Sequence, residues 1–241
     1  EIAIDDVDGK RLDIKEVKMA RRKELEYVKN MGVNKVLPIQ KCWDQTGKQP
    51  IGIRWVDHDK GSGAVRSYRS ILVAKEFKWQ SAGGAEDLFA ATPPMETKKF
   101  LLSLAMTEGY GYDRKNRWPR LRIECIDVKR AFFHAKCRRE VYVDLPPEDA
   151  EEGMCGRLRM AMYGTRDAPQ NWEFEYGEFM ESVGFVKGKS TPCLFYHEQR
   201  NIRAVVYGDD FTLLAESKQL DWFRKRISER FEVEFKARLG G

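Results

Sequence analysis

The segment 204–214 constrains this chain most, because it holds two apolar runs separated by a short polar break. The first run ends at Tyr207; Gly208, Asp209 and Asp210 follow, and the second apolar run then begins. This pattern predicts a tight β-hairpin between two largely buried strands, since Gly supplies the positive φ that such a turn needs. Two carboxylates between buried strands repel each other unless a cation neutralises them. The segment therefore predicts either a cation site, which needs a third carboxylate from elsewhere, or an exposed Asp–Asp turn.

Composition limits the remaining possibilities. The 241 residues are 42% hydrophobic and 34% charged, which suits one large domain or two intimate subdomains. A net charge of +5 favours a polyanionic partner only mildly. The five cysteines form no C-x-x-C pair and the three histidines are far apart, so we expect a reducing compartment and neither a zinc site nor a disulfide framework. No apolar run is long enough to span a bilayer and no signal peptide is visible, so no membrane partner is expected. Because the chain begins at Glu1 without Met and stops at Gly241, we expect a segment of a longer protein.

Apolar periodicity predicts four helices and, besides the second strand of the 204–214 hairpin, seven strands. The helices are expected over 14–31, 98–108, 167–183 and from Ser217 onward, with Thr97 and Ser217 as caps and Phe100, Leu101, Leu104 and Ala105 facing inward. The strands are expected over 51–56, 68–74, 121–127, 141–145, 193–197, 202–207 and 231–235. Strict alternation of strand and helix is missing, so this order predicts an α+β fold with an antiparallel sheet and helices on one face.

Asp127 is the candidate for the third carboxylate, because it ends the strand 121–127, where sheet-based sites usually lie. If that strand neighbours the hairpin, Asp127, Asp209 and Asp210 converge. Mg²⁺ prefers such oxygen ligands, and two ions about 4 Å apart can clamp the attacking and leaving oxygens of a phosphoryl displacement. The alternative is that Asp127 only caps the turn that follows it.

Several motifs occur in a fixed order over residues 50–240. They are Ile53-Arg-Trp-Val56, Leu72-Val-Ala-Lys-Glu-Phe77, Asp127-Val-Lys-Arg-Ala-Phe132, Val141-Tyr-Val143 with Pro146-Pro147, Met162-Tyr-Gly-Thr-Arg-Asp-Ala-Pro169 with Trp172, and Tyr207-Gly-Asp-Asp210. In this order they resemble the reverse transcriptase of copia-type LTR retrotransposons. The resemblance implies an N-terminal helical and irregular segment over 1–49, a fingers-like subdomain over 50–120 and a ferredoxin-like palm over 121–241.

The resemblance also implies a catalytic centre. Asp127, Asp209 and Asp210 match the catalytic carboxylates that bind two Mg²⁺ ions, for which Mn²⁺ is a possible substitute, and the Val128 carbonyl matches a further metal ligand. The implied reaction is RNA-directed DNA synthesis, in which deoxynucleotides are transferred to a primer 3′-hydroxyl.

Five further positions match residues that bind the nucleotide. Phe132 matches an aromatic gate that would clash with a ribose 2′-hydroxyl. Gly164 and Pro169 match the turn and helix start near the template and nascent base pair. Arg69 and Lys75 lie on the basic 51–74 hairpin and its continuation, which contacts the triphosphate in this family; without the resemblance, a solvated ribbon is equally compatible with those charges.

Two departures from the family pattern keep alternatives open. Gly208 stands where the family usually has Val, and Tyr-Gly-Asp-Asp is also familiar from RNA-dependent RNA polymerases, although Phe132 favours DNA synthesis. Ile71 stands where the family commonly has Arg, so a decayed, non-catalytic remnant that binds nucleic acid is the second alternative; Arg69, two residues away on the same strand face, is a candidate replacement. The partners implied are an RNA or DNA template with its primer, deoxynucleoside triphosphates, and flanking integrase and RNase H domains. The implied location is the cytoplasm, where virus-like particles could hold the chain, with the nucleus as the alternative.

Overall fold

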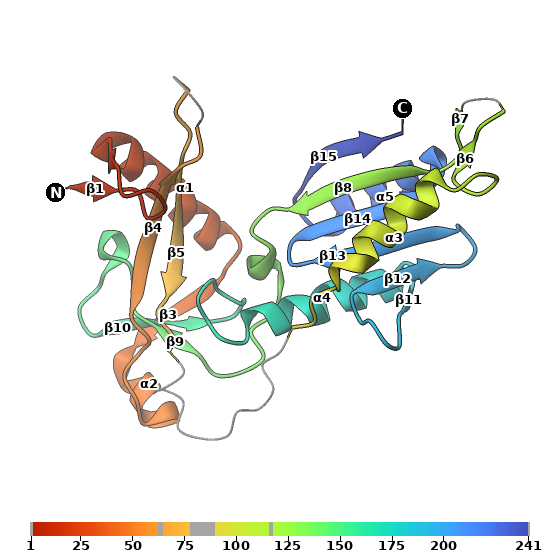
Figure 1. Ribbon diagram of the computed structural model, residues 1–241. Helices are drawn as coiled ribbons and strands as arrows, with labels where there is room; N and C mark the ends of the chain where they lie inside the picture. Colours follow the sequence, from red (N-terminus) through yellow and green to blue (C-terminus); the bar gives the residue numbers. More distant parts are fainter. Residues whose placement is uncertain (1, 62–64, 78–89, 116–117, 241) are drawn as a thin grey trace. The chain divides into compact units, whose positions relative to one another are not determined.

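The computed structural model describes residues 2–61, 65–77, 90–115 and 118–240 (Figure 1). They fall into two compact units, one formed by Glu1–Leu88 with Phe132–Asn171 and the other by Phe89–Ala131 with Trp172–Gly241. Both units combine helices with antiparallel sheets, which confirms a mixed α and β fold. The predicted division at residues 49 and 120 stays a prediction. Among the described residues, no helix is both long enough and apolar enough to cross a bilayer.

The first unit contains small antiparallel sheets and two helices. Its elements are β1 (Ala3–Ile4), β2 (Arg11–Leu12), α1 (Ile14–Asn30), β3 (Asn34–Pro38), α2 (Ile39–Thr46), β4 (Ile53–Asp59), β5 (Tyr68–Ala74), β9 (Tyr142–Val143), the 3₁₀ turn η3 (Pro147–Asp149) and β10 (Met154–Leu158). β4 pairs with β5 as the sequence predicts. A further sheet holds β3, β10 and β9, of which β9 lies within the predicted strand 141–145 and β3 and β10 were not predicted. Helix α1 begins where Asp13 accepts hydrogen bonds from the Lys15 and Glu16 N–H groups.

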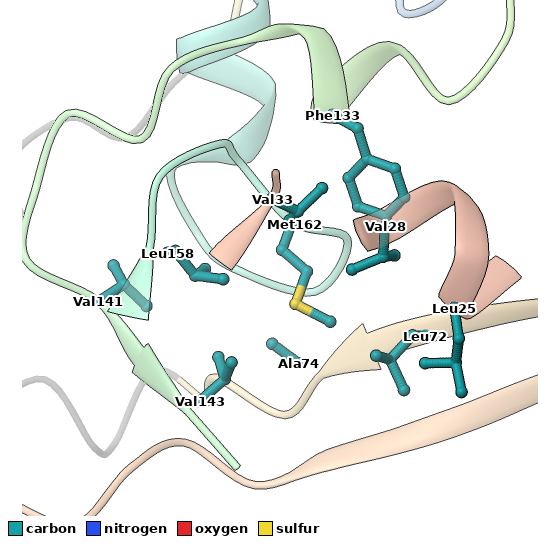
Figure 2. Close-up of a cluster of buried hydrophobic side chains, with 10 residues drawn as sticks. All are labelled: Leu25, Val28, Val33, Leu72, Ala74, Phe133, Val141, Val143, Leu158 and Met162. Atoms are coloured by element: carbon teal, nitrogen blue, oxygen red, sulfur yellow. The ribbon is translucent and has the colours of Figure 1, made fainter. Parts of the chain in front are cut away.

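The core of this unit draws on segments far apart in the sequence. Figure 2 shows side chains from α1, β5, β9, β10 and the turn after β10 closing around one apolar space. They are Leu25, Val28, Val33, Leu72, Ala74, Phe133, Val141, Val143, Leu158 and Met162. The β4–β5 hairpin is therefore fixed at its base by a core that α1 and β9–β10 share.

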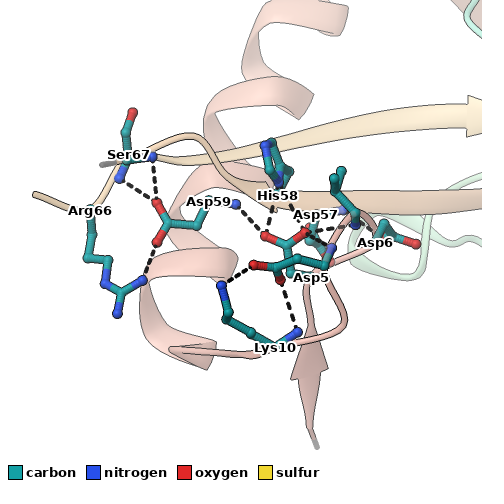
Figure 3. Close-up of polar contacts among 11 residues, drawn as sticks. Asp5, Asp6, Lys10, Asp57, His58, Asp59, Arg66 and Ser67 are labelled. Carbon is teal, nitrogen blue, oxygen red and sulfur yellow. Dashed lines mark hydrogen bonds and ion pairs between the residues drawn. The ribbon is translucent and has the colours of Figure 1, made fainter. Parts of the chain in front are cut away.

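A buried carboxylate ties the N-terminus to β4. Asp5 is buried and accepts hydrogen bonds from the N–H groups of Val7 and Asp59, each at 2.8 Å, and its carboxylate lies 3.0 Å from Nδ1 of His58 (Figure 3). Although burial alone would raise the pKa of Asp5, the hydrogen bonds from Asp59, Val7 and His58 outweigh it and hold the pKa well below its usual range. Asp6 adds a link, because it accepts from the Asp57 N–H at 2.7 Å. These hydrogen bonds anchor the first residues of the chain to the β4–β5 hairpin.

The second unit is built on a six-stranded antiparallel sheet in the order β11-β12-β13-β14-β8-β15. Its elements are α3 (Met95–Met106), β6 (Tyr112–Asp113), β7 (Trp118–Pro119), β8 (Arg122–Val128), α4 (Ala168–Ser182), β11 (Val186–Lys187), β12 (Leu194–His197), β13 (Ile202–Tyr207), β14 (Asp210–Ala215), α5 (Ser217–Arg230) and β15 (Val233–Leu239). The 3₁₀ turn η2 (Ala131–His134) and the first turn of α4 cross the boundary between the units. When β9, β10, β11 and β12 are left out, the remaining elements β8, α4, β13, β14, α5 and β15 come in the order βαββαβ, which is the order that a ferredoxin-like unit would have.

The expectation that helices cover one face of the sheet is wrong. Phe211 on β14 lies against Tyr176 of α4 and Phe223 of α5, with ring centroids 6.0 and 6.5 Å away. Leu214, three residues further along β14, packs instead with Leu101 of α3. Figure 1 shows α3 and α5 on opposite sides of the sheet. Because consecutive residues of the central strands are apolar, both faces of the sheet need a covering helix.

Helix α3 also differs in its start and its inward face. It begins at Met95, directly after Pro94, so Thr97 lies inside the first turn and does not cap the helix. Leu101 and Ala105 are buried as predicted, but Phe100 is 59% exposed. Leu104 is half-buried and packs against the same cluster as Leu101 and Ala105, so Phe100 is the one of the four predicted residues that the sheet does not cover.

Candidate active site

The catalytic candidates lie at a hairpin that has the predicted form. Tyr207 and Asp210 are paired across it, which leaves Gly208 and Asp209 as the two turn residues. Gly208 has φ of +61°, whereas Asp209 does not have a positive φ. A glycine with positive φ at the first central position is the pattern of a type II′ turn, which matches the twist of paired strands. The strands on either side are largely buried, as predicted.

Asp127 lies directly across from Asp210. Strand β14 pairs with β8, and Asp210 and Asp127 are partners in the register. Residues that face each other in this way project from the same face of a sheet, with Cβ atoms about 5 Å apart. The condition set by the sequence, that the two strands are neighbours, is therefore met. In addition, the Val128 N–H donates to the Asp209 carbonyl at 2.9 Å, so β8 also holds the turn.

The exposure of these carboxylates differs from the expectation. Asp127 is half-buried, and Asp209 and Asp210 are exposed. The argument that burial forces the hairpin to hold a cation is therefore wrong, because water solvates both turn carboxylates. Among the residues that the structure describes, no group of three or more His, Cys, Asp or Glu side chains could hold a metal ion together. What the fold supplies is an opposed carboxylate pair with a third carboxylate next to it in the sequence.

Strand β15 adds a carboxylate and an ammonium group that sequence reasoning missed. Glu234 is the register partner of Asp127 on its other side, so Asp210, Asp127 and Glu234 follow one another across three strands. The Lys236 Nζ lies 2.9 Å from the Glu234 carboxylate. The pKa of Lys236 is raised, first by its hydrogen bond to Glu234 and further by the charges of Asp127 and Asp210. The sequence carried no signal for this, since nothing in it specifies that β15 pairs with β8.

Trp172 also contacts the hairpin. Its indole Nε1–H donates to the Gly208 carbonyl at 2.8 Å. The sequence indicated only that Trp172 belongs to an apolar stripe of its helix, and it is indeed buried. The contact to the turn could not be predicted from that stripe.

Phe132, the predicted sugar gate, lies in η2 and belongs to the first unit. It is half-buried, and its ring packs on Tyr163 with centroids 4.7 Å apart. Phe133 beside it is fully buried in the core of that unit. The turn that the sequence predicted after Asp127 therefore presents one aromatic ring at a partly open position and buries the other.

Gly164 fills a position that only glycine fits. Its φ is +84°, and a Cβ there would lie 2.0 Å from the Ala74 carbonyl oxygen and 2.6 Å from a Val73 methyl carbon. The contact is fixed, because the Ala74 N–H donates to the Tyr163 carbonyl at 2.8 Å. Pro169 follows as the exposed second residue of α4, in the first helical turn as the sequence indicated.

An ion cluster that sequence reasoning missed fixes the chain between Gly164 and Pro169. The Arg139 guanidinium contacts both the Glu76 and Asp167 carboxylates, the latter at 2.8 Å, and Glu76 also accepts from the Arg166 N–H at 2.8 Å. Burial raises the pKa of Asp167, but the Arg139 hydrogen bond and charge together with the Asn171 amide outweigh it and lower the pKa overall.

Arg69 and Lys75 lie on β5 and directly after it. Ser70, Leu72 and Ala74 form the buried face of this strand, whereas Arg69 lies on the opposite face with Ile71. Arg69 and Ile71 therefore project from the same face of the strand, as Arg69 must if it is to replace the arginine that the family commonly has at position 71. Lys75 lies close to Asp144, whose pKa is raised by burial and lowered in part by the Lys75 charge.

Residues 40–240 match the family model described as "Reverse transcriptase (RNA-dependent DNA polymerase)". The chain belongs to the reverse transcriptase family. A retrovirus-related Pol polyprotein from transposon TNT 1-94 of Nicotiana tabacum is 27% identical to this chain over 83% of the chain's length. The Pol polyproteins from transposons RE2 and RE1 of Arabidopsis thaliana are 29% and 27% identical over 80% of it. These relatives confirm the resemblance to copia-type retrotransposons. The chain spans only 14% of the tobacco polyprotein and 13% of each Arabidopsis one.

Proposed function

We propose that this chain is the fingers and palm of an RNA-directed DNA polymerase, with the second unit as the palm and the β4–β5 hairpin as part of the fingers. The reaction is template-directed transfer of a deoxynucleotide to a primer 3′-hydroxyl. The observation that carries the proposal is the register pairing of Asp127 with Asp210 on neighbouring strands, with Asp209 in the turn between β13 and β14.

The residues at this hairpin suit Mg²⁺. Carboxylate oxygens are hard ligands, and Mg²⁺ usually takes one or two carboxylates while water and substrate phosphates complete its octahedron. Asp127 and Asp210, which face each other on neighbouring strands at an exposed hairpin, therefore suit Mg²⁺ better than a closed site made only of protein ligands would. The negative field of the pair reaches Lys236, whose pKa it helps to raise. Asp127, Asp209, Asp210 and the Val128 carbonyl are the proposed ligands, and Mn²⁺ is expected to replace Mg²⁺.

When bound, two divalent ions would neutralise the triphosphate and stabilise the charge that develops on the attacking and leaving oxygens. The remaining work falls to side chains. Arg69 and Lys75 are proposed to neutralise the triphosphate tail, and Gly164 and Pro169 to support the nascent base pair. Phe132 is proposed to exclude a ribose 2′-hydroxyl by steric clash.

The proposed setting is a retrotransposon Pol polyprotein. The relatives are named as Pol polyproteins and are several times longer than this chain. We propose that integrase and RNase H segments flank this one and that a primed RNA or DNA template is the partner. Cytoplasmic virus-like particles are the proposed location.

The test is primer extension on an RNA template by the wild-type chain, followed by its Asp209→Asn variant. The amide keeps the shape of the side chain but cannot supply the negative charge, so we expect extension to fall by about 100-fold or more. Glu229→Gln is the matched control, because Glu229 is an exposed acid on α5 that forms a local ion pair with Arg226, three residues earlier in the same helix. Equal extension by wild type and Asp209→Asn, or none by the wild type, would overturn the proposal; the second result would indicate the non-catalytic remnant.

A further inference from the structure

The peptide groups on both sides of the Asp209 α-carbon are anchored. The carbonyl before it, that of Gly208, accepts the Trp172 indole N–H at 2.8 Å. The carbonyl after it, that of Asp209 itself, accepts the Val128 N–H at 2.9 Å. Since these two peptide planes define φ and ψ of Asp209, the two hydrogen bonds together fix the direction of its Cα–Cβ bond.

The hairpin tip benefits from such an anchor because its residues are exposed. Tyr207 is 50% exposed, and Gly208 and Asp209 are exposed as well. A Cβ at Gly208 would touch nothing within 4 Å, so no neighbouring group packs against this side of the residue. Glycine also has the widest choice of backbone angles. Without the indole, the peptide between Gly208 and Asp209 would lose the hydrogen bond that ties it to the core, and any rotation of this peptide would turn the carboxylate with it.

Trp172 is rigid enough to serve as the anchor. It is 1% exposed, and its ring meets Tyr176 and Phe231 edge to face at centroid distances of 5.6 and 5.1 Å. Tyr176 in turn packs on Phe211, the residue that follows Asp210. A buried tryptophan whose N–H has a partner transmits the position of its helix to that partner. The hydrogen bond therefore ties the carboxylate hairpin to the core of α4.

We propose that Trp172 is a positioning residue for the metal-binding carboxylates, which acts through the Gly208 carbonyl to hold Asp209 in one orientation. This inference rests on the proposed function. Groups that orient metal ligands without touching the metal commonly contribute about 10- to 100-fold in metal affinity or activity. A tryptophan that only fills the core would affect stability and leave metal affinity unchanged.

The test compares Trp172→Phe with Tyr176→Phe. Phenylalanine at 172 keeps an aromatic ring but has no N–H. The change at 176 keeps the ring that packs on Trp172 and Phe211 and removes only a hydroxyl that interacts with Cys193 and not with the turn. Mn²⁺ binding is measured by electron paramagnetic resonance in the absence of nucleotide, and melting temperature is measured in parallel. We expect Trp172→Phe to weaken Mn²⁺ binding about tenfold and Tyr176→Phe to leave it within about twofold of wild type.

Primer extension supplies a second readout. Trp172→Phe should raise the Mg²⁺ concentration for half-maximal extension about tenfold and lower kcat, while KM for the deoxynucleotide stays within about twofold. If Trp172→Phe does not fold, a benzothienyl analogue at position 172, with sulfur in place of N–H, keeps the shape and tests the same bond. Unchanged Mn²⁺ binding in a folded variant, or equal weakening by Tyr176→Phe, would overturn the inference. A wild-type chain that binds Mn²⁺ through the hairpin but extends no primer would overturn the proposed function instead.

Discussion

Gly164→Ala is the substitution whose cost the structure defines most sharply. The new methyl group would lie 2.0 Å from the Ala74 carbonyl oxygen and 2.9 Å from the Ala74 carbonyl carbon. The backbone at Ala74 cannot move aside, because its N–H is bonded to Tyr163. Overpacking of this kind costs about 1–3 kcal/mol, and a φ of +84° adds about 1–2 kcal/mol for a residue with a Cβ. We therefore expect the free energy of unfolding to fall by about 3 kcal/mol.

The matched control is Gly153→Ala in the same unit. Gly153 has φ of +72°, but a Cβ there would meet nothing within 4 Å. This variant should lose only about 1 kcal/mol, through its backbone angle alone. Urea unfolding followed by circular dichroism measures both; with a slope of about 3 kcal/mol per molar, Gly164→Ala should lower the midpoint by about 1 M. Equal stability of the two variants would refute the packing argument and leave Gly164 free for a purely functional explanation.

Three further outcomes follow from particular contacts. Glu124 is 0% exposed and accepts hydrogen bonds from Arg224 at 2.9 Å and Arg238 at 2.8 Å. Glu124→Gln should therefore lower the free energy of unfolding by about 3 kcal/mol in thermal unfolding, whereas the exposed Glu229→Gln should change it little. An equal effect of the two substitutions would contradict this. Phe132→Ala should raise ribonucleotide incorporation relative to deoxynucleotide incorporation in primer extension, and an unchanged ratio would remove Phe132 from the gate. Because the pKa of Asp5 is lower in the folded chain than in the unfolded chain, the Asp5 carboxylate stabilises the fold at pH values above about 4. This stabilisation is lost as the pH falls toward about 2, because the unfolded chain then binds more protons. Asp5→Asn should therefore make the melting temperature depend less on pH between about pH 4 and about pH 2 than it does in the wild type. If the melting temperatures of variant and wild type fell in parallel over this range, the expectation would be contradicted.

The site could be predicted from sequence where local pattern and chemistry coincide. The break at Gly208 between two apolar runs specified the hairpin, because a turn with positive φ and flanking buried strands leave few other options. Asp127 was identifiable because it ends a core strand. Its position opposite Asp210 depends on which strands pair, and the sequence could state that only as a condition.

The contacts that cross between elements were not predictable. In the sequence, Trp172 is one of several apolar residues on one face of a helix. The apolar periodicity does not indicate which group accepts the hydrogen bond from its indole N–H. Glu234 and Lys236 lie in a strand that was expected, but its place at the edge beside β8 is set by tertiary packing. Apolar periodicity places Phe100 in the core with Leu101, Leu104 and Ala105, yet Phe100 is 59% exposed, because exposure at the margin of an apolar helix face depends on how far the sheet extends beneath it.

The most direct test of the account is whether Asp127 and Asp210 bind the same divalent ion. Mn²⁺ dissociation constants are measured by electron paramagnetic resonance for wild type, Asp127→Asn, Asp210→Asn and the double variant. Groups that share one ligand are non-additive, so we predict that each single variant weakens binding at least about tenfold and that the double variant is little weaker than either. Losses that multiply in the double variant, or binding that neither substitution changes, would contradict the account.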